Sequence, residues 1–231
     1  MKAYSIVISE NEISEHGYKE LVKSSKDVGN DFEIEKLKAA VPADVGTMLQ
    51  ELKIEWDYPW EFPEFDIKSG IKKIIYPTKN RAARVACALS HFTAWCGCLI
   101  SNEAFLVLEH DALFIEKLDF TPEDFTAPIL GINDPRGATR KSSTFYKLMN
   151  DNPDQFQLAP WVDKDHIIPQ GLAGNSAYII KPEGAKMLID LVRKFGLWPN
   201  DAIMCRQLIP TLGISKKIYT TVQGLASTTS L

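Results

Sequence analysis

The pattern of apolar residues predicts a long helix and a buried strand near the middle of the chain. After Asn80, a plausible helix cap, apolar residues recur at steps of three and four: Val85, Leu89, Phe92, Trp95 or Cys96, and Leu99. This spacing places them on one face of a helix. Residues 104–108 then form an unbroken apolar run, AFLVL, which is typical of a central strand covered on both faces.

Helical and extended patterns alternate along the rest of the chain. Strands are expected at residues 4–8, 32–37, 128–132, 171–180 and 218–220. Helices are expected at residues 45–52, 182–195 and 198–210, and a first helix should run from a capping box at Ser9 and Glu12 to about Ser25. This alternation predicts an α/β fold with a mostly parallel central sheet flanked by helices. The length fits a single domain, 1–231.

Residues 56–66 interleave five aromatic residues with acids and two prolines, which neither a helix nor a central strand accommodates easily. Packing of the rings, which would pin a loop to the body of the protein, is the favoured interpretation. Sugar binding is the alternative, because the rings could stack on a sugar while the carboxylates accept from its hydroxyls.

Periodicity is lost between residues 138 and 170, so this segment is expected to be a long loop. Loops of this length often act as lids or specificity elements. The loop region carries Arg136, Arg140 and Lys141, and it also contains His166, which is interpreted as a surface residue rather than a metal ligand.

Composition narrows the class of protein. The net charge of −4 argues against broad affinity for nucleic acid. The four cysteines form no CxxC pair and are expected to be reduced core thiols, which indicates a cytoplasmic protein. We expect no membrane span and no signal peptide, because the apolar runs are short and the first one soon meets polar residues.

The strand at 104–108 runs directly into Glu109, His110 and Asp111. Two carboxylates at i and i+2 point to the same side of an extended chain, and at the end of a strand they can converge on one divalent cation. Ligand sites of open α/β sheets gather outside the carboxyl ends of the strands. This acidic corner is therefore the main candidate site.

Basic residues gather just before and at the start of the central helix, where Arg81 and Arg84 follow Lys72, Lys73 and Lys79. A helix N-terminus with arginines can hold phosphate. For any single one of these residues, a solvated basic face is the more common outcome. At the start of the helix expected at 198–210, Asp201 taken alone would be interpreted as a helix cap, which is the more common role of an Asp at that position.

Several segments together resemble a known family. ACALSHFTAW at residues 86–95 and FLVLEHDA at residues 105–112 are similar to the GCxLSHxxxW and ILEDDA core of glycosyltransferase family 25, lipooligosaccharide galactosyltransferase type. Residues 174–180 with 184–186 resemble its later G-x-x-A-Y block, and residues 199–201 resemble its P-x-D element. The matching segments span about half the chain.

The resemblance implies a GT-A-like fold, a UDP-sugar donor and a Mn²⁺ or Mg²⁺ ion at the acidic corner. It assigns Asp111 as the first metal ligand and Glu109 as the second carboxylate, which contacts the metal or the ribose of the donor. Asp201 is the expected catalytic base, because members of this type invert the anomeric centre. Residues expected to bind the donor are Arg81, Arg84, Ser90, His91, Glu109 and Asn175.

The sequence departs from the family at His110, where Asp is common, and this leaves the metal preference open. As the middle residue of an extended segment, His110 is expected to face away from the two acids. Without the resemblance, Ser90 and His91 would be interpreted as a satisfied pair in the core.

The favoured function is transfer of galactose or glucose from a UDP-sugar to a glycan acceptor, in lipopolysaccharide biosynthesis. Three alternatives stay open. The acceptor could be modified DNA or a protein, which the basic loop favours weakly. The chain could also be a catalytically idle nucleotide- or carbohydrate-binding module, or another nucleotide-dependent transferase such as a nucleotidyltransferase.

Overall fold

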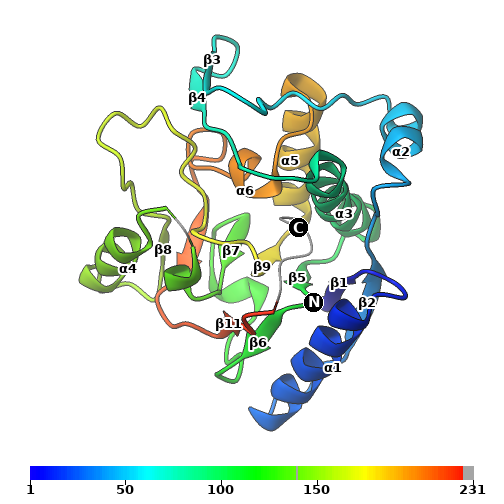
Figure 1. The fold of residues 1–231 in the computed structure, drawn as a ribbon. Helices are drawn as coiled ribbons and strands as arrows, with labels where there is room; N and C mark the ends of the chain where they lie inside the picture. The colour runs from blue at the N-terminus through cyan, green and yellow to red at the C-terminus, as the bar shows by residue number, and fades with distance from the viewer. Residues whose placement is uncertain (139, 226–231) are drawn as a thin grey trace.

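The computed structural model describes residues 1–138 and 140–225, and its centre is a seven-stranded sheet (Figure 1). In spatial order the strands are β2 (Ile34–Lys38), β1 (Lys2–Val7), β5 (Phe105–Glu109), β9 (Ala177–Ile180), β7 (Ile129–Gly131), β10 (Gly213–Ser215) and β8 (Phe156–Leu158). Strands β9 and β8 run opposite to the other five. The α/β class with a mostly parallel sheet is therefore confirmed.

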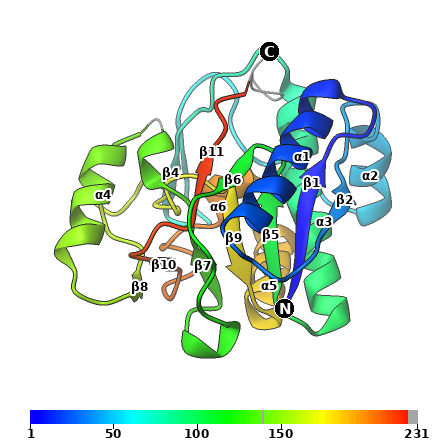
Figure 2. The ribbon, with the colours of Figure 1, turned by 90° about the horizontal axis from the view of Figure 1, so that it is seen from below.

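Helices cover both faces of the sheet. Successive side chains of β5 point to opposite faces, so this strand contributes to an apolar cluster on each side. Phe105 and Val107 pack in one apolar cluster with α3 (Arg81–Ser101) and α5 (Pro182–Phe195). Leu106 and Leu108 pack in a second cluster with α1 (Glu12–Asp27). Figure 2 shows α1 and α5 on opposite sides of the sheet, while α2 (Val45–Leu52) lies beside α3.

The remaining elements are short. Two two-stranded pairs lie outside the main sheet, β3 (Glu64–Asp66) with β4 (Ile71–Lys73) and β6 (Ala112–Phe114) with β11 (Thr220–Val222). Helix α6 (Asn200–Ile203) follows α5, and two 3₁₀ turns, η1 (Pro122–Asp124) and η2 (Pro135–Gly137), flank β7.

Helix α3 forms as the sequence predicts. The side chain of Asn80 accepts a hydrogen bond from the Ala83 N–H at 2.9 Å and so caps the first turn. Among the predicted stripe, Val85, Leu89, Phe92 and Trp95 are buried. Among the described residues, α3 also has the length and hydropathy of a membrane span, but 61% of its apolar window is buried inside the protein, as in a core helix.

The start of α1 differs from the prediction. The helix begins at Glu12 and its cap is Asn11, whose side chain accepts from the Ser14 N–H at 3.0 Å. The chain turns before this point, with Glu10 at a positive φ of 62°, so Ser9 lies outside the helix and the predicted capping box is wrong. The Ser14 hydroxyl accepts from the Ile8 N–H instead and ties the helix to the end of β1.

The segment 138–170 contains regular structure that the sequence pattern does not predict. Helix α4 (Ser142–Asp151) buries two side chains, Phe145 and Met149, and β8 forms one edge of the sheet. One apolar pair four residues apart is too little to establish a helical period. The predicted long loop is therefore wrong over α4 and β8.

The aromatic segment 56–66 packs against the body of the protein, as the favoured interpretation expects. Trp56 stacks on Trp60 with ring centroids 4.8 Å apart, and the buried Tyr58 contacts Trp198 at 5.7 Å. Phe62 and Phe65 are different, since they are 79% and 54% exposed. They lie on or beside the hairpin β3–β4 at the edge of the molecule (Figure 1).

Candidate active site

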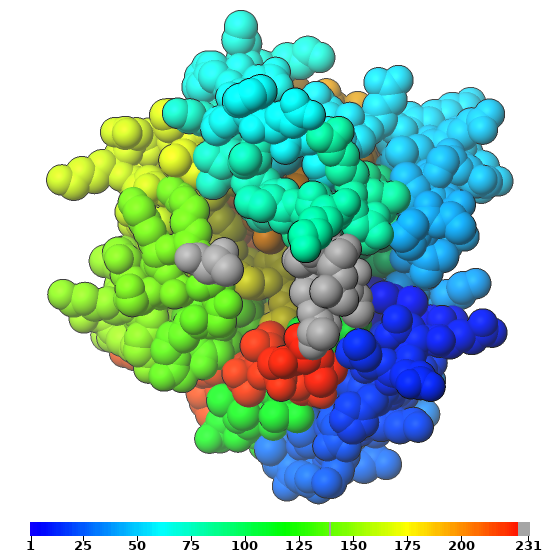
Figure 3. Space-filling model, in the orientation of Figure 1, coloured from blue at the N-terminus to red at the C-terminus, as the bar shows by residue number. Residues whose placement is uncertain are grey.

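A cavity of about 560 Å³ opens where the strands of the sheet end. Its lining combines residues that follow β1, β2, β5 and β7 with residues 173–176, which precede β9, and with the first turns of α3 and α6. Because β9 is reversed, its beginning lies at the same edge as the ends of its neighbours β5 and β7. Figure 3 shows this face hollowed near its centre, with yellow and orange segments visible inside the hollow.

Glu109, Asp111 and Asp201 line this cavity, together with a fourth carboxylate, Asp134, which pairs with Arg136. Glu109 is the last residue of β5, and Asp111 follows two residues later. Asp201 lies in the first turn of α6. One arginine, Arg84 of α3, lines the same cavity, and its guanidinium lies 5.6 Å from the centre of the Tyr76 ring. The fold therefore gathers acidic residues from positions more than 90 residues apart.

A chain of hydrogen bonds inside the core holds Glu109. The Trp95 indole N–H donates to the Tyr178 hydroxyl at 2.9 Å, and that hydroxyl lies 2.9 Å from Nδ1 of the buried His91. His91 Nε2 is 3.2 Å from Oε1 of Glu109. If Tyr178 donates its own proton to Nδ1, the neutral imidazole carries its proton on Nε2 and donates to Glu109. These linked hydrogen bonds thus orient the Glu109 carboxylate.

Glu109, Asp111 and Asp201 differ in their tendency to ionise. Burial opposes ionisation of Glu109, but the hydrogen bond from His91 and the positive charge of Arg84 act against burial, and the pKa of Glu109 is lowered. Burial and then the charge of Glu109 raise the pKa of Asp111 to about 7. Burial also raises the pKa of Asp201, although Arg84 acts in the opposite direction.

The negative charge at this site is only partly compensated. Within residues 1–138 and 140–225, the buried Oδ1 atoms of Asp111 and Asp201 have no hydrogen-bond partner. Unpaired carboxylate oxygens of this kind suit a hard divalent cation such as Mn²⁺ or Mg²⁺, which prefers oxygen ligands. The residues present therefore fit such an ion, with Asp111 and Glu109 as the carboxylates closest together in sequence.

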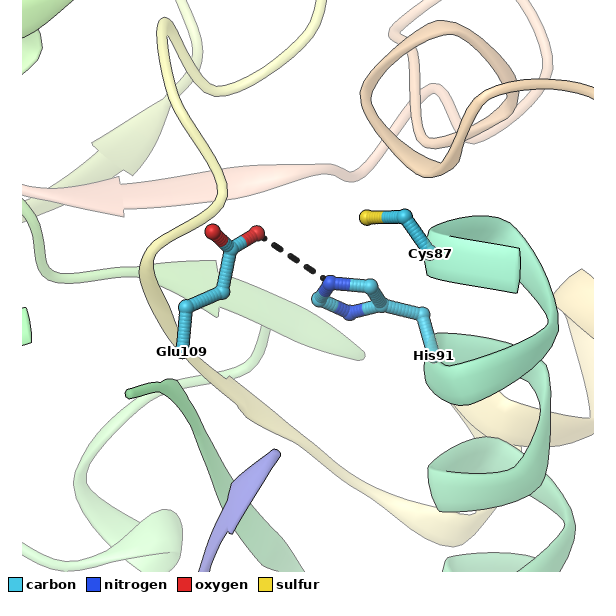
Figure 4. Close-up of side chains that lie close together, drawn as sticks. All are labelled: Cys87, His91 and Glu109. Atoms are coloured by element: carbon cyan, nitrogen blue, oxygen red, sulfur yellow. Dashed lines mark hydrogen bonds and ion pairs between the residues drawn. The ribbon is translucent and has the colours of Figure 1, made fainter. Parts of the chain in front are cut away.

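A second group of possible ligands lies beside these acids. Ligand atoms of Cys87, His91 and Glu109 all lie within 4.8 Å of one another (Figure 4). Burial raises the pKa of the Cys87 thiol, and its sulfur donates a weak hydrogen bond to Oδ1 of Asn200 at 3.8 Å. Because both His91 nitrogens already have partners and the thiol holds its proton, this group acts here as a hydrogen-bonding cluster.

The comparison with known families bears on this cavity directly. The model of glycosyltransferase family 25, described as an LPS biosynthesis protein, matches residues 78–204, more than half of the chain. The chain belongs to glycosyltransferase family 25. It is therefore a glycosyltransferase, and the matched region includes Glu109, Asp111 and Asp201. A comparison with curated proteins found no match.

In this family 25 enzyme, most of the expected donor-binding residues line the cavity: Arg84, Ser90, His91, Glu109 and Asn175. Ser90 also has a structural contact, since its hydroxyl accepts from the Ala40 N–H at 2.9 Å and donates to the Ala86 carbonyl. With its amide oxygen turned toward α6, Asn175 accepts from the Asp201 N–H at 3.3 Å. Asn175 thus supports the segment that carries Asp201.

Arg81 is the expected donor ligand that lies elsewhere. It is not among the described residues that line the cavity, and its guanidinium pairs with Glu61 at 3.0 Å and lies over the Trp60 ring. Arg81 and Arg84 are three residues apart on α3, but the first is exposed while the second faces the cavity. The position of Glu61, 20 residues earlier, could not be predicted from helical spacing.

His110 lies at the cavity, contrary to the expectation that it turns away from the acids. The strand ends at Glu109 and the chain turns at His110 and Asp111, so strand alternation does not extend past Glu109. His110 lines the cavity together with both acids, and burial lowers the pKa of its imidazole.

Several lining residues, among them Asn133 and Asn200, were not predicted. Asn133 follows β7 and donates to the carbonyls of Asp134 and Ala173. It lies in the turn between β7 and η2. Nothing in the local sequence shows that this loop meets the one before β9.

Proposed function

We propose that this family 25 glycosyltransferase is a metal-dependent inverting enzyme that moves galactose or glucose from a UDP-sugar to a hydroxyl of a glycan acceptor. The proposal includes the β-1,4-galactosyltransferase type that acts on lipooligosaccharide. The observation that supports it best is that Glu109, Asp111 and Asp201 line one cavity, where Asp111 and Asp201 each have an unpaired buried oxygen. The free cysteines agree with the cytoplasmic location that we include in the proposal.

Glu109 and Asp111 would hold the donor through a bound metal ion. Asp111, with Glu109 beside it, would coordinate Mn²⁺ or Mg²⁺, and His91 would keep the Glu109 carboxylate oriented and ionised. A bound divalent cation would offset the negative charge that develops on the pyrophosphate as the sugar leaves. Arg84 would supply a second positive charge from the first turns of α3.

Asp201 would act as the general base. In an inverting transfer, the acceptor oxygen forms its bond to the anomeric carbon while the bond to the UDP oxygen breaks, and the hydroxyl proton must go to a base. Burial raises the pKa of Asp201, which brings its basicity closer to the working pH than that of an exposed carboxylate. Asp201 lines the same cavity as Glu109 and Asp111.

The structure weakens the argument for a DNA acceptor. Arg136 pairs with Asp134 at 2.7 Å, and Arg140 and Lys141 both pair with Asp163. Two carboxylates of the same protein thus offset two of these three positive charges, so little positive charge is left for phosphates. The idle binding module and the nucleotidyltransferase become outcomes of the experiment below.

The test is UDP release from UDP-galactose and UDP-glucose with MnCl₂, for the wild type and for Asp111→Asn. We expect the variant to lose about 100-fold or more of its turnover while its circular dichroism spectrum is unchanged, because the metal charge acts on the leaving group. The matched control is Asp27→Asn, an exposed acid at the end of α1.

Retained turnover in Asp111→Asn would exclude the metal assignment. Binding of UDP without turnover on either donor would favour the idle module. Turnover that releases galactose 1-phosphate or glucose 1-phosphate instead of UDP would indicate a nucleotidyltransferase.

A further inference from the structure

The hairpin β3–β4 exposes large apolar side chains at the edge of the molecule (Figure 1). Phe62, Phe65 and Ile67 are 79%, 54% and 89% exposed. They fall within six residues of sequence, so they gather on one protruding segment, which is also visible at the top of Figure 3. Exposed single apolar residues are common, but three large ones on one small hairpin indicate an interaction surface.

Strand alternation explains why this surface is separate from the core. Ile71, Lys73 and Asp66 point inward and are buried, while Phe65 and its cross-strand partner Lys72 are exposed on the outer side. Lys68 at the turn is exposed as well. We call Phe62, Phe65, Ile67, Lys68 and Lys72 the hairpin tip. It combines apolar side chains with lysines in the outer layer.

The hairpin is firmly attached to the body of the protein. The buried Lys73 ammonium lies 3.1 Å from Asp57 and 3.5 Å from Asp66, and it also contacts the Trp198 ring at 4.4 Å. On the other side, the Lys72 N–H donates to the Ile167 carbonyl at 2.7 Å. Because both strands are held, the exposed side chains are presented in a fixed position.

The charge near the hairpin is opposite to that of the whole protein. Among the exposed charged residues of 61–81, four are Lys or Arg (68, 72, 79 and 81) and two are Glu (61 and 64), a net charge of +2, while the chain carries −4. Juxtaposed apolar and basic side chains match a lipid surface with anionic headgroups, where rings enter the interface and lysines remain at the headgroups. A hairpin of this size offers little area for a stable protein interface.

We propose that the hairpin tip binds an anionic membrane surface. The cavity follows the hairpin closely along the chain, since β4 ends at Lys73 and the cavity residues Asn80 and Arg84 lie at the start of α3. Binding through the tip would therefore hold the cavity near the membrane. This suits an enzyme of a family described by LPS biosynthesis. The inference does not depend on the identity of the sugar donor.

The test is co-sedimentation of the full chain with vesicles of phosphatidylcholine alone and with 30% phosphatidylglycerol, a composition of about one anionic lipid in three. We expect binding to the anionic vesicles only. The triple variant Phe62→Ser, Phe65→Ser, Ile67→Ser should bind at least about tenfold more weakly. Lys68→Glu with Lys72→Glu should also weaken binding, and 0.5 M NaCl should reduce binding of the wild type.

The matched control is Ile100→Ser, which removes an apolar side chain that is 85% exposed at the far end of α3. It should bind vesicles like the wild type. All variants should release UDP from a soluble donor at the wild-type rate, which separates this inference from the proposed activity.

Absence of vesicle binding, or equal loss in Ile100→Ser and the triple variant, would overturn the proposal. A wild-type dimer in light scattering that the triple variant turns into a monomer would show that the tip binds a second copy of the chain instead.

Discussion

Two regions of this enzyme bury charge, and they treat it differently. Under the hairpin β3–β4, Lys73 is 2% exposed and has two carboxylates, the Asp57 carbonyl at 2.9 Å and an aromatic ring as partners. At the cavity, Glu109, Asp111 and Asp201 share one arginine, and two of their oxygens have no partner in the described part of the chain. The buried charge under the hairpin is thus fully paired, and the buried charges at the cavity are not.

This difference in pairing distinguishes a buried charge that stabilises the fold, Lys73, from the buried carboxylates of the cavity, which we assign to function. A buried ion that is fully paired holds two segments together, and losing its partner is costly. Carboxylates that are buried with incomplete compensation reduce the stability of the folded protein until a cation arrives. We infer that this cost is retained at the cavity because the unpaired oxygens bind the metal and accept the proton of the acceptor.

The largest effect is expected at Asp201. Asp201→Asn keeps the size of the side chain and removes its basicity, so kcat should fall about 10²- to 10⁴-fold with little change in KM for the donor. Steady-state kinetics with saturating MnCl₂ measures this. Asp190→Asn, an exposed acid of α5 that pairs with Lys186, is the control. A loss of less than tenfold would remove Asp201 from the role of base.

The fully paired charge under the hairpin is tested by Lys73→Met. The variant leaves Asp57 and Asp66 without their cation, and the free energy of unfolding should fall by about 3–5 kcal/mol. Urea unfolding measures the change. Lys72→Met, the neighbour on the outer side of the same strand, should change it by no more than about 0.5 kcal/mol. Equal effects of the two substitutions would mean that the buried pairing is not important for stability.

The pH dependence of metal binding sharpens the contrast. Without a cation, burial and Glu109 hold the pKa of Asp111 at about 7, so below this pH a proton competes with the metal. The affinity for Mn²⁺ should fall about tenfold for each pH unit below 7 and level off above it. Calorimetric titration from pH 5.5 to 8 checks this, and an affinity that is constant over this range would contradict it.

The smallest effect concerns stability without metal. The pKa of Asp111 is raised from its ordinary value of 3.8, so the folded protein holds an extra proton between pH 4 and 7 and loses stability as the pH rises through this range. Asp111→Asn cannot ionise. At pH 8 its Tm should exceed that of the wild type by on the order of a few degrees, and at pH 4 the two should converge. A lower Tm at pH 8 would show that the carboxylate stabilises the fold.

Much of the fold could be predicted because local patterns carry it. The cap at Asn80, the stripe along α3 and the proline and glycine that bound α5 each act within a few residues. Helix α4 was not predicted, because Phe145 and Met149 are its only buried residues and they do not establish a helical period. The acidic corner was identified because strand and acids are adjacent in sequence.

The partners of the site residues could not be predicted, since the fold brings them from distant segments. His91 meets Tyr178 across 87 positions, and Arg81 is drawn away from the cavity by Glu61. His110 was placed on the wrong side because the turn after β5 replaces the extended geometry that the prediction assumed. In each case the local sequence specifies the residue, and the tertiary fold decides which group it faces.

The most direct test of the account is anomalous diffraction from crystals soaked in MnCl₂ and UDP. We predict a manganese peak within coordination distance of the Asp111 carboxylate, with Glu109 beside it and the pyrophosphate between the metal and Arg84. A map with no peak at these acids, and with the nucleotide outside the cavity, would contradict the claim that the unpaired carboxylates form the donor site.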